Sequence, residues 1–139
     1  MWTKKPFALS YQVTSPFGPR VHPITHEQSF HKGIDFGMPV GTPLLASYNG
    51  VIENGEDDID GKYVKIKFIT PELTRGFFLY CHLSEHTLPN KSKVVTGDQV
   101  GLSGNTGHST GPHLHFQLEL MLKKDQYSVV NPMQYVNFA

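Results

Sequence analysis

Three things that are scarce in this 139-residue sequence limit what the protein can be. Cysteine occurs once, as Cys81, so neither an intrachain disulfide nor a zinc site built from several thiolates can form. Charge is balanced, with 12 Lys and Arg against 12 Asp and Glu, which leaves no electrostatic reason to expect nucleic acid as a partner. Apolar runs are short, and none approaches the roughly 20 residues of a membrane-spanning helix, so we expect no membrane insertion.

The sequence is rich in residues that fill a core and in residues that separate chain segments. Hydrophobic residues make up 38%, including 9 Phe and 6 Tyr, which is enough to bury one core in a chain of this length. The 13 Gly and 10 Pro are spread widely and favour short strands joined by turns over long helices. We therefore expect residues 1–139 to form a single compact domain that is mostly antiparallel β-sheet, with little helix.

The segment from His113 to Leu120 shows the pattern of a half-buried strand most clearly. Polar and apolar residues alternate in it without a break, and successive side chains of a strand point to opposite faces. His113 and His115 therefore stand side by side on one face, with Cα atoms about 6.5–7 Å apart. One imidazole can then bind a metal while its neighbour reaches the open coordination position of that metal.

Other patterns predict further strands, several turns and one short helix. Strands are expected at 62–70 and 76–83, a strand broken by Asn49-Gly50 at 44–52, short strands with a turn at 94–102, and a glycine-rich loop at 104–112. Turns are expected at 15–20, 22–25, Asn54-Gly55, Asp60-Gly61 and 123–125, and a short terminal helix is expected with Asn131 as its N-cap. Residues 1–30 are otherwise irregular by pattern.

His31 and Asp35 supply a second pair of metal-binding side chains. A helix would place them on one face, but Gly33 between them and Gly37 and Pro39 just beyond oppose a helix. We expect a short strand and a tight turn to bring the two side chains together. Zinc in a hydrolytic site typically takes three nitrogen or oxygen ligands and leaves a fourth position for water. The histidines and this carboxylate suffice for one such site, and a spare imidazole could act as a base or hydrogen-bond an oxyanion.

Several separated motifs also follow one another along the chain in a recognisable order. They are His31-x-x-x-Asp35, Tyr80-Cys-His-Leu-Ser84 and Gly104-Asn-Thr-Gly-x-Ser-Thr-Gly-Pro-His-Leu-His115, with Phe17-Gly-Pro-Arg20 and Asn131-Pro132 towards the two ends. Together they resemble the motifs of the lysostaphin/LytM-type (M23) zinc metallopeptidases, which are peptidoglycan endopeptidases. The likeness covers a core of about residues 15–136, and several motifs in order make it far more specific than a single His-x-His pair.

The resemblance implies a narrow groove over the antiparallel sheet with one zinc ion per chain at its floor. It makes His31, Asp35 and His115 the metal ligands. It makes His82 and His113 the catalytic histidines, which orient or deprotonate the attacking water and stabilise the tetrahedral intermediate. The implied activity is hydrolysis of peptide bonds of bacterial peptidoglycan, in a cross-bridge or a stem peptide, at the cell wall. We expect the protein to work as a monomer.

Three further residues are candidates for contacting substrate or supporting the metal ligands: Tyr80, Gln117 and Asn105. Strand alternation puts Tyr80 on the same face as His82, where its hydroxyl could hydrogen-bond substrate. Gln117 stands where many members of the family carry Glu, so an amide would orient a metal ligand with less charge than a carboxylate. Asn105 lies in the glycine-rich loop. Cys81 points away from His82 by the same alternation and is expected to be a buried small side chain.

Three alternative interpretations stay open. His82-Leu-Ser-Glu85-His86 matches the His-x-x-Glu-His pattern of inverzincins, which needs both histidines on one helix face, whereas this segment follows an apolar strand. Cys81 could be the nucleophile of a cysteine peptidase, if a histidine and an activating charge lay within reach. The third alternative is a non-catalytic peptidoglycan-binding or regulatory module of the same fold.

Residues 1–10 lack the apolar stretch of a secretory signal peptide. A protein that acts on the cell wall would then reach it by another route. We expect a phage lysin or virion-associated lytic module, release through a holin, or a processed secreted domain.

Overall fold

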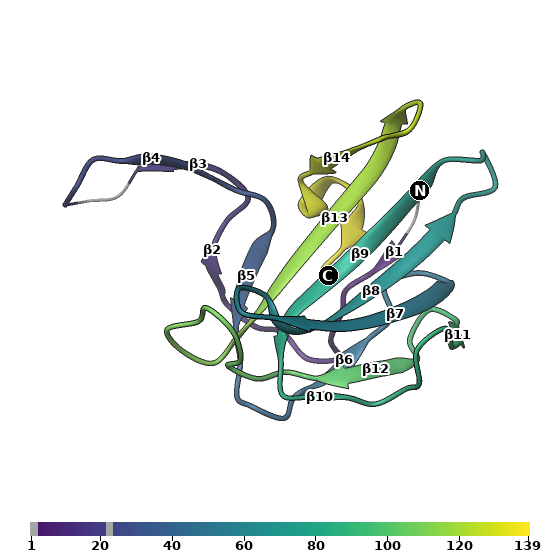
Figure 1. The fold of residues 1–139 in the computed structure, drawn as a ribbon, viewed down its shortest axis with the longest axis horizontal. Coiled ribbons are helices and arrows are strands. Elements are labelled where there is room, and N and C mark those ends of the chain that lie inside the picture. Colours follow the sequence, from purple (N-terminus) through teal and green to yellow (C-terminus); the bar gives the residue numbers. More distant parts are fainter. Residues whose placement is uncertain (1–2, 22–23) are drawn as a thin grey trace.

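The structure, a computed structural model, describes residues 3–21 and 24–139. Its centre is an antiparallel sheet with strand order β11-β7-β8-β9-β13-β5-β2, and β14 pairs with the distal part of β13 (Figure 1). The strands are β2 (Val13–Ser15), β5 (Ile34–Gly37), β7 (Gly50–Asp57), β8 (Gly61–Ile69), β9 (Arg75–Leu83), β11 (Lys93–Val94), β13 (His113–Lys123) and β14 (Gln126–Val130).

Shorter elements surround this sheet. They are the β3 (Gly18–Val21) and β4 (Gln28–His31) hairpin, a sheet of β6 (Pro43–Leu45), β10 (Glu85–His86) and β12 (Gln99–Leu102), the parallel pair β1 (Thr3–Lys4) and β15 (Val136–Asn137), and a 3₁₀ helix at Pro132–Gln134. The β3–β4 hairpin projects from the body as an arm in Figure 1. A helix with the length and apolar character needed to cross a bilayer does not occur in the described part of the chain.

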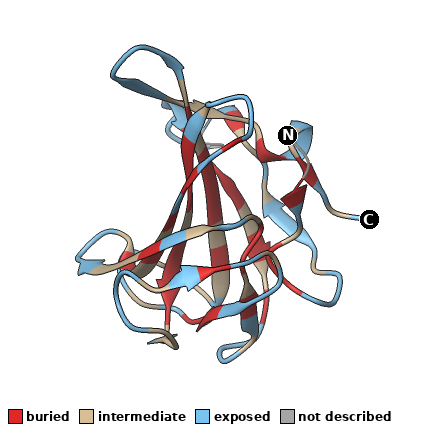
Figure 2. Cartoon of the chain, turned by 90° about the vertical axis from the view of Figure 1, so that its right-hand side faces the viewer, coloured by how far each residue is buried: buried red, intermediate tan, exposed pale blue. Residues whose placement is uncertain are grey.

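The apolar face of β13 forms the middle of the core. Leu114, Phe116 and Leu118 have no exposed surface, and the Phe116 ring stacks on Phe78 of β9 with ring centroids 5.4 Å apart. Each such fully buried side chain contributes roughly 1.5–3 kcal/mol by leaving water. Figure 2 shows the buried positions running as bands along the central strands. The alternation predicted for residues 113–120 is confirmed, and the expectation of a mostly antiparallel β fold is confirmed with it.

Most of the expected elements are present. Strands β8, β9 and β13 lie where strands were predicted, and Asn131 caps the 3₁₀ helix by accepting a hydrogen bond from the Met133 amide at 3.0 Å. The break predicted at Asn49-Gly50 within 44–52 is confirmed, because β6 ends at Leu45 and β7 begins at Gly50. Residues 1–30, predicted to be irregular, supply short strands. Of the turn expected at 22–25, residues 22 and 23 lie outside the described residues.

The turn predicted at Asn54-Gly55 is wrong. Both residues lie inside β7, in register with β8, where Gly55 stands opposite Tyr63. The Tyr63 ring occupies the place that a Cβ on Gly55 would take. This glycine therefore allows a close ring-to-backbone approach within a sheet, and it does not make a turn.

A bulge near the end of β9 changes which side chains share a face. Val64 of β8 stands opposite Tyr80, but Lys62 stands opposite Leu83, so Cys81 and His82 together occupy the space of one residue. His82 has a positive φ of 68°, which is the backbone distortion that accommodates the extra residue. Strand alternation therefore stops at this point, and side chains before and after the bulge do not follow a simple two-residue period.

Candidate metal centre

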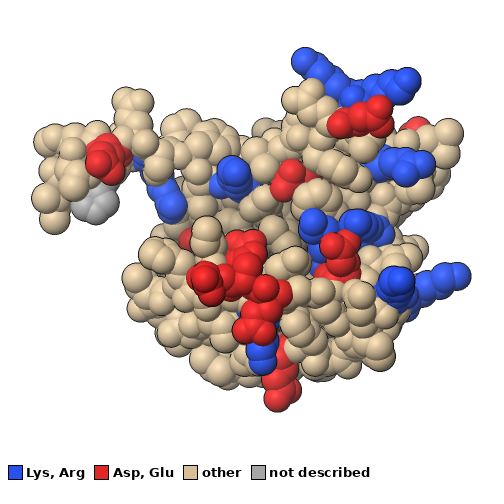
Figure 3. All heavy atoms as spheres, viewed as in Figure 1, with Lys and Arg blue, Asp and Glu red and all other residues tan. Residues whose placement is uncertain are grey.

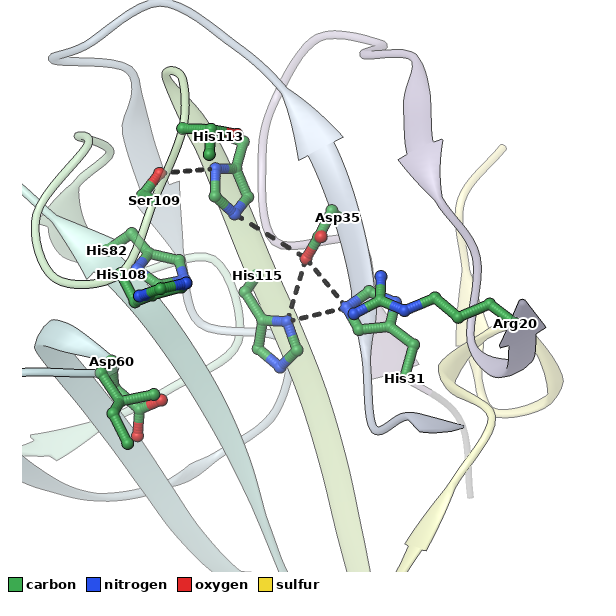
Figure 4. Close-up of a pocket in the computed structure, with 11 residues that line it drawn as sticks. Arg20, His31, Asp35, Asp60, His82, His108, Ser109, His113 and His115 are labelled. Atoms are coloured by element: carbon green, nitrogen blue, oxygen red, sulfur yellow. Dashed lines mark hydrogen bonds and ion pairs between the residues drawn. The ribbon is translucent and has the colours of Figure 1, made fainter. Parts of the chain in front are cut away.

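Three side chains that are distant in the sequence meet at the junction of β4, β5 and β13 (Figure 4). His115 of β13 stands directly opposite Asp35 of β5, so the sheet register brings this pair together. His31 ends β4 and reaches the same place across a two-residue turn that contains Gly33. A Cβ on Gly33 would lie only 2.9 Å from the His115 ring and 2.5 Å from the Phe116 carbonyl oxygen. Glycine is therefore needed for this approach.

The donor atoms of these residues form a small triangle. Asp35 Oδ1 lies 3.2 Å from His31 Nε2 and 2.9 Å from His115 Nδ1, and the two nitrogens are 3.2 Å apart. Ligands placed about 2.1 Å from a tetrahedral ion stand about 3.4 Å from one another. The triangle therefore fits three corners of a tetrahedron, and the fourth corner points into the groove.

The other ring nitrogen of each histidine has its own partner. His31 Nδ1 donates to the Pro16 carbonyl oxygen at 2.9 Å, and His115 Nε2 donates to Gln117 Oε1 at 2.9 Å. Because a carbonyl oxygen can only accept, these bonds place the proton on His31 Nδ1 and on His115 Nε2. The nitrogens that face Asp35 are then left with free lone pairs, as metal ligation requires.

Gln117 extends this support along β13. Its side chain is buried, its carbonyl oxygen accepts from His115, and its amide nitrogen donates to Glu119 Oε2 at 2.7 Å. The three side chains form a relay, His115–Gln117–Glu119, that ends in a carboxylate. The amide predicted to support a metal ligand is thus in contact with that ligand, and a negative charge lies one side chain further away.

The pKa values of the cluster follow from these contacts. Burial alone would raise the pKa of Asp35. When His115 or His31 takes up a second proton on the nitrogen that faces Asp35, the hydrogen bond and the charge of that ring hold the pKa of Asp35 far below its usual range. Burial opposes charge on His115, yet the hydrogen bonds to Asp35 and Gln117 raise its pKa overall. Asp35 is therefore a carboxylate at neutral pH, the form that binds a cation.

Two further imidazoles face the open corner of the triangle. His82 Nδ1 donates to the Thr106 carbonyl oxygen at 2.7 Å, and His113 Nδ1 donates to the Gly111 carbonyl oxygen at 2.8 Å. Each ring therefore keeps a free lone pair on Nε2. The two ring centroids are 4.7 Å apart, and His113 Nε2 lies 3.9 Å from Asp35 Oδ1. Burial lowers the pKa of His82 against the opposing effect of the Thr106 carbonyl, so this ring is neutral at pH 7.

The glycine-rich loop 104–112 holds both of these rings. Thr106 anchors it by donating from Oγ1 to the Leu83 carbonyl oxygen at 2.6 Å. Gly107, with a φ of 76°, packs against the backbone of Gly61 so closely that a Cβ would overlap it. Contact between this loop and the β7–β8 turn therefore sets the position of the carbonyl groups that orient His82 and His113.

Asn105 takes part in the same loop without lining the groove. Its Oδ1 accepts a hydrogen bond from Ser109 Oγ at 2.5 Å, and Ser109 Oγ lies 3.0 Å from His113 Nδ1. The contact found for Asn105 is thus with Ser109, one residue away from the imidazole.

The prediction that Tyr80 shares a face with His82 is wrong, because the β9 bulge lies between them. Tyr80 has no exposed surface, and its hydroxyl donates to the Leu45 carbonyl oxygen at 2.8 Å inside the core. Cys81, predicted to point away from His82, stands opposite His115 and so lies on the groove side of the sheet. It is nevertheless buried, and burial together with Asp60 raises the pKa of its thiol. A thiol held neutral in this way is a poor nucleophile.

The inverzincin interpretation is not supported by the local structure. His82 and Glu85 lie on separate strands, β9 and β10, and no helix joins His82 to His86. His86 Nε2 donates instead to the Tyr63 carbonyl oxygen at 2.9 Å. The two histidines of the His-x-x-Glu-His pattern therefore do not share a metal site.

A groove of about 330 Å³ runs over the triangle, lined by Arg20, His31, Asp35, Ile59, Asp60, His82, His108, Ser109, Thr110, His113 and His115. Arg20, Asp60 and His108 have no role that was predicted from the sequence. Arg20 belongs to a motif noted only as an edge of the resemblance, and Asp60 belongs to a dipeptide taken only as a turn. Their presence in the groove depends on packing between distant segments, which no local pattern indicates.

Three nitrogen and oxygen donors with an open fourth position, flanked by two further imidazoles, define a hydrolytic metal centre. The chain belongs to peptidase family M23, whose family model matches residues 29–132.

Relatives and solved structures agree with this assignment. The chain is 41% identical over 115 residues to the peptidoglycan DD-endopeptidase ShyA of Vibrio cholerae, a match that covers 81% of this chain and 26% of ShyA. The catalytic domain of the prophage-encoded M23 protein EnpA from Enterococcus faecalis has a TM-score of 0.75 at 33% identity and covers 95% of this chain and 96% of that domain. A zinc-containing peptidase from Vibrio cholerae has a TM-score of 0.75 at 31% identity, over 90% of this chain and 37% of its own. This chain spans about a quarter to a third of the length of the curated relatives it matches.

Proposed function

We propose that this chain is a zinc-dependent endopeptidase that hydrolyses peptide bonds of bacterial peptidoglycan, in a cross-bridge or a stem peptide. The observation that carries the proposal is a triangle of three donor atoms with sides of 2.9, 3.2 and 3.2 Å, faced by two imidazoles with free Nε2 lone pairs. The activity for which ShyA is named supports the substrate class.

In this proposal His31, Asp35 and His115 hold one zinc ion through Nε2, Oδ1 and Nδ1. Pro16 and Gln117 fix the two rings by accepting from their other nitrogens, which orients each ring and raises its basicity towards a cation. A zinc ion held there supplies Lewis acidity, which polarises a carbonyl group and lowers the pKa of water to about 7.

His82 and His113 move protons. When neutral, each ring presents an Nε2 lone pair that can accept a proton from the attacking water. When protonated, each ring can donate that Nε2–H to the developing oxyanion or to the leaving amine nitrogen. The Thr106 and Gly111 carbonyls hold both rings in the required tautomer throughout. Two imidazoles on the open side thus allow one to accept a proton while the other stabilises negative charge.

We propose that the protein works at the bacterial cell wall as a monomer, with the peptidase unit at about residues 15–136 of a single domain. Delivery by a phage, release through a holin, or processing of a secreted domain stays a hypothesis.

Digestion of defined muropeptides, read by mass spectrometry with and without a chelator, tests the proposal. We expect cleavage at one class of peptide bond, loss of cleavage with chelator, and recovery on adding zinc. Cleavage that survives chelation but stops on thiol alkylation would instead favour a cysteine peptidase. Bound zinc without cleavage of any wall type would favour the non-catalytic module.

A further inference from the structure

Two charged side chains line the groove without taking part in the metal site or in proton transfer: Arg20 and Asp60. Arg20 comes from β3 and approaches the groove on the side of His31 (Figure 4). Asp60 comes from the turn before β8 and lies on the opposite side, towards His82. The groove therefore carries a cation at one end and an anion at the other, with the metal site between them.

Arg20 is held in place by neutral groups. Its Nη1 donates to Ser15 Oγ at 2.9 Å and its Nε donates to Ser29 Oγ at 3.3 Å. None of the ion pairs among the described residues involves Arg20. A guanidinium has five N–H groups in a planar fork that matches a carboxylate. Within residues 3–21 and 24–139, two of these groups are used, which leaves a charged donor surface for a ligand.

Asp60 is also fixed without a cationic partner. Its backbone amide donates to Asp57 Oδ1 at 2.6 Å, and its carbonyl oxygen accepts from the His82 amide at 2.7 Å. Its side chain is partly exposed, and no Lys or Arg of the described residues forms an ion pair with it. Figure 3 shows acidic side chains gathered over this turn between β7 and β8. The carboxylate of Asp60 accepts a hydrogen bond from the Cys81 thiol, but it has no cationic partner among the described residues and can still receive a positive group of a ligand.

We propose that this polarity selects the substrate: Arg20 binds a free carboxylate on the leaving-amine side of the scissile bond, and Asp60 binds an ammonium group on the acyl side. The proposal rests on the proposed function and refines it. A cross-link made through a diamino dicarboxylic acid fits, because the carbon bearing the scissile nitrogen also bears a free carboxylate and an ammonium group can stand on the acyl side. A glycine bridge offers neither charge.

Matched substrates and matched variants test this assignment. The substrates are a muropeptide cross-linked through a diamino dicarboxylic acid, the same compound with the carboxylate next to the scissile nitrogen amidated, the same compound with its free amine acetylated, and a glycine-bridged muropeptide. The variants are Arg20→Gln, Arg20→Lys and Asp60→Asn. Arg75→Gln and Asp58→Asn serve as controls, because these charges lie outside the groove. Zinc content and circular dichroism establish that each variant is folded and loaded.

The charged cross-link should be the preferred substrate, and amidation should lower kcat/KM by roughly 10- to 100-fold through KM, as expected when a charged hydrogen-bonded group loses its partner. Arg20→Gln should cause a loss of similar size on the carboxylate substrate and remove the difference between the free and amidated forms. Arg20→Lys should recover part of that loss, since it keeps the charge without the fork. Asp60→Asn should lower kcat/KM for the substrate with the free amine by a similar factor and remove the difference between the free and the acetylated substrate. The control variants Arg75→Gln and Asp58→Asn should leave kcat/KM on all four substrates unchanged.

Equal cleavage of the free and amidated substrates by the unmodified protein would overturn the assignment, as would an equal loss on all four substrates in Arg20→Gln, which would indicate a purely structural role. Cleavage of the glycine bridge in preference to the charged cross-link would also overturn it while leaving the peptidase function intact. Failure to cleave any of the four would count against the proposed function itself.

Discussion

The metal-facing triangle and the two groove imidazoles are positioned by different kinds of structure. His115 and Asp35 are direct partners across the β13–β5 ladder, so their separation is set by sheet register. His82 depends instead on a bulge, and the rings of both His82 and His113 are oriented by carbonyl groups of the glycine-rich loop. Metal binding and proton transfer should therefore be separable by mutation, although the two groups of side chains lie within one groove.

The largest effect is expected from His31→Ala. This change removes one of three ligands, and we expect loss of bound zinc and a fall in activity of about 10³-fold or more, because polarisation of the carbonyl and activation of water fail together. Elemental analysis of the purified protein and a muropeptide assay provide the measurement. His86→Ala is the control, since the His86 ring bonds to the Tyr63 carbonyl oxygen and not to the triangle, so this change should leave zinc content unchanged. The opposite pattern would support the inverzincin assignment.

The next largest effect is expected from His82→Gln and His113→Gln. Each variant should keep its zinc and lose about 10²- to 10⁴-fold in kcat, the usual size of a general acid–base contribution. The double variant should lose less than the product of the two single losses, because the rings act on the same proton transfers. Loss of zinc in either variant would show that the two groups of side chains are not separable.

Substitutions at two glycines, Gly33 and Gly107, test whether metal binding and proton transfer can be changed independently through the backbone. Gly33→Ala places a Cβ against the His115 ring and should weaken zinc binding. Gly107→Ala adds a Cβ at a φ of 76°, against the Gly61 backbone, and should shift the loop that orients His82. We expect Gly107→Ala to lower kcat by roughly 10- to 100-fold, since small misplacements of reacting groups are costly, with zinc content unchanged. Similar effects of both substitutions on zinc content would contradict this division.

The relay along β13 should tune metal affinity by a smaller amount. Gln117→Leu removes the acceptor of His115 Nε2 and should weaken zinc binding about 10-fold, the lower end of what a lost supporting hydrogen bond costs. Gln117→Glu brings a carboxylate into direct contact and should tighten binding, whereas Glu119→Gln should weaken it slightly. Competition with a chromophoric chelator measures all three. Equal affinity in Gln117→Leu and the unmodified protein would show that the relay does not support the ligand.

The difference between the two groups of side chains also explains what the sequence could predict. The alternation from His113 onward predicts both the buried face of β13 and the shared face of its histidines, because polar and apolar residues alternate there with the two-residue period of a strand. Assignment of the ligand set came from the resemblance to a family. The bulge at His82 could not be predicted, since a positive φ at a non-glycine residue leaves no signature in the pattern. The wrong prediction that Tyr80 shares a face with His82 follows from this bulge.

Arg20 and Asp60 were missed for another reason. Their place in the groove depends on how the β3–β4 arm and the β7–β8 turn pack beside the sheet, and these segments lie far apart in the chain. Residue type alone favours a solvated surface for any single Arg or Asp. Only the tertiary arrangement turns them into the two ends of a polar groove.

The smallest expected effect is a pH dependence of stability that belongs to His82. Burial lowers the pKa of this imidazole below its ordinary 6.5, so below pH 6.5 the unfolded chain binds more protons at this position than the folded protein does. The contribution of His82 to the free energy of unfolding is therefore intact above pH 6.5 and is lost as the pH falls through the folded pKa. Urea unfolding of the zinc-loaded protein and of His82→Gln between pH 5 and 7 measures this contribution. The free energy of unfolding should fall less steeply on acidification in His82→Gln, and the difference between the two proteins is the contribution of this one imidazole. Parallel curves for the two proteins would mean that His82 is not desolvated, and its assignment as a neutral proton acceptor would fail with that result.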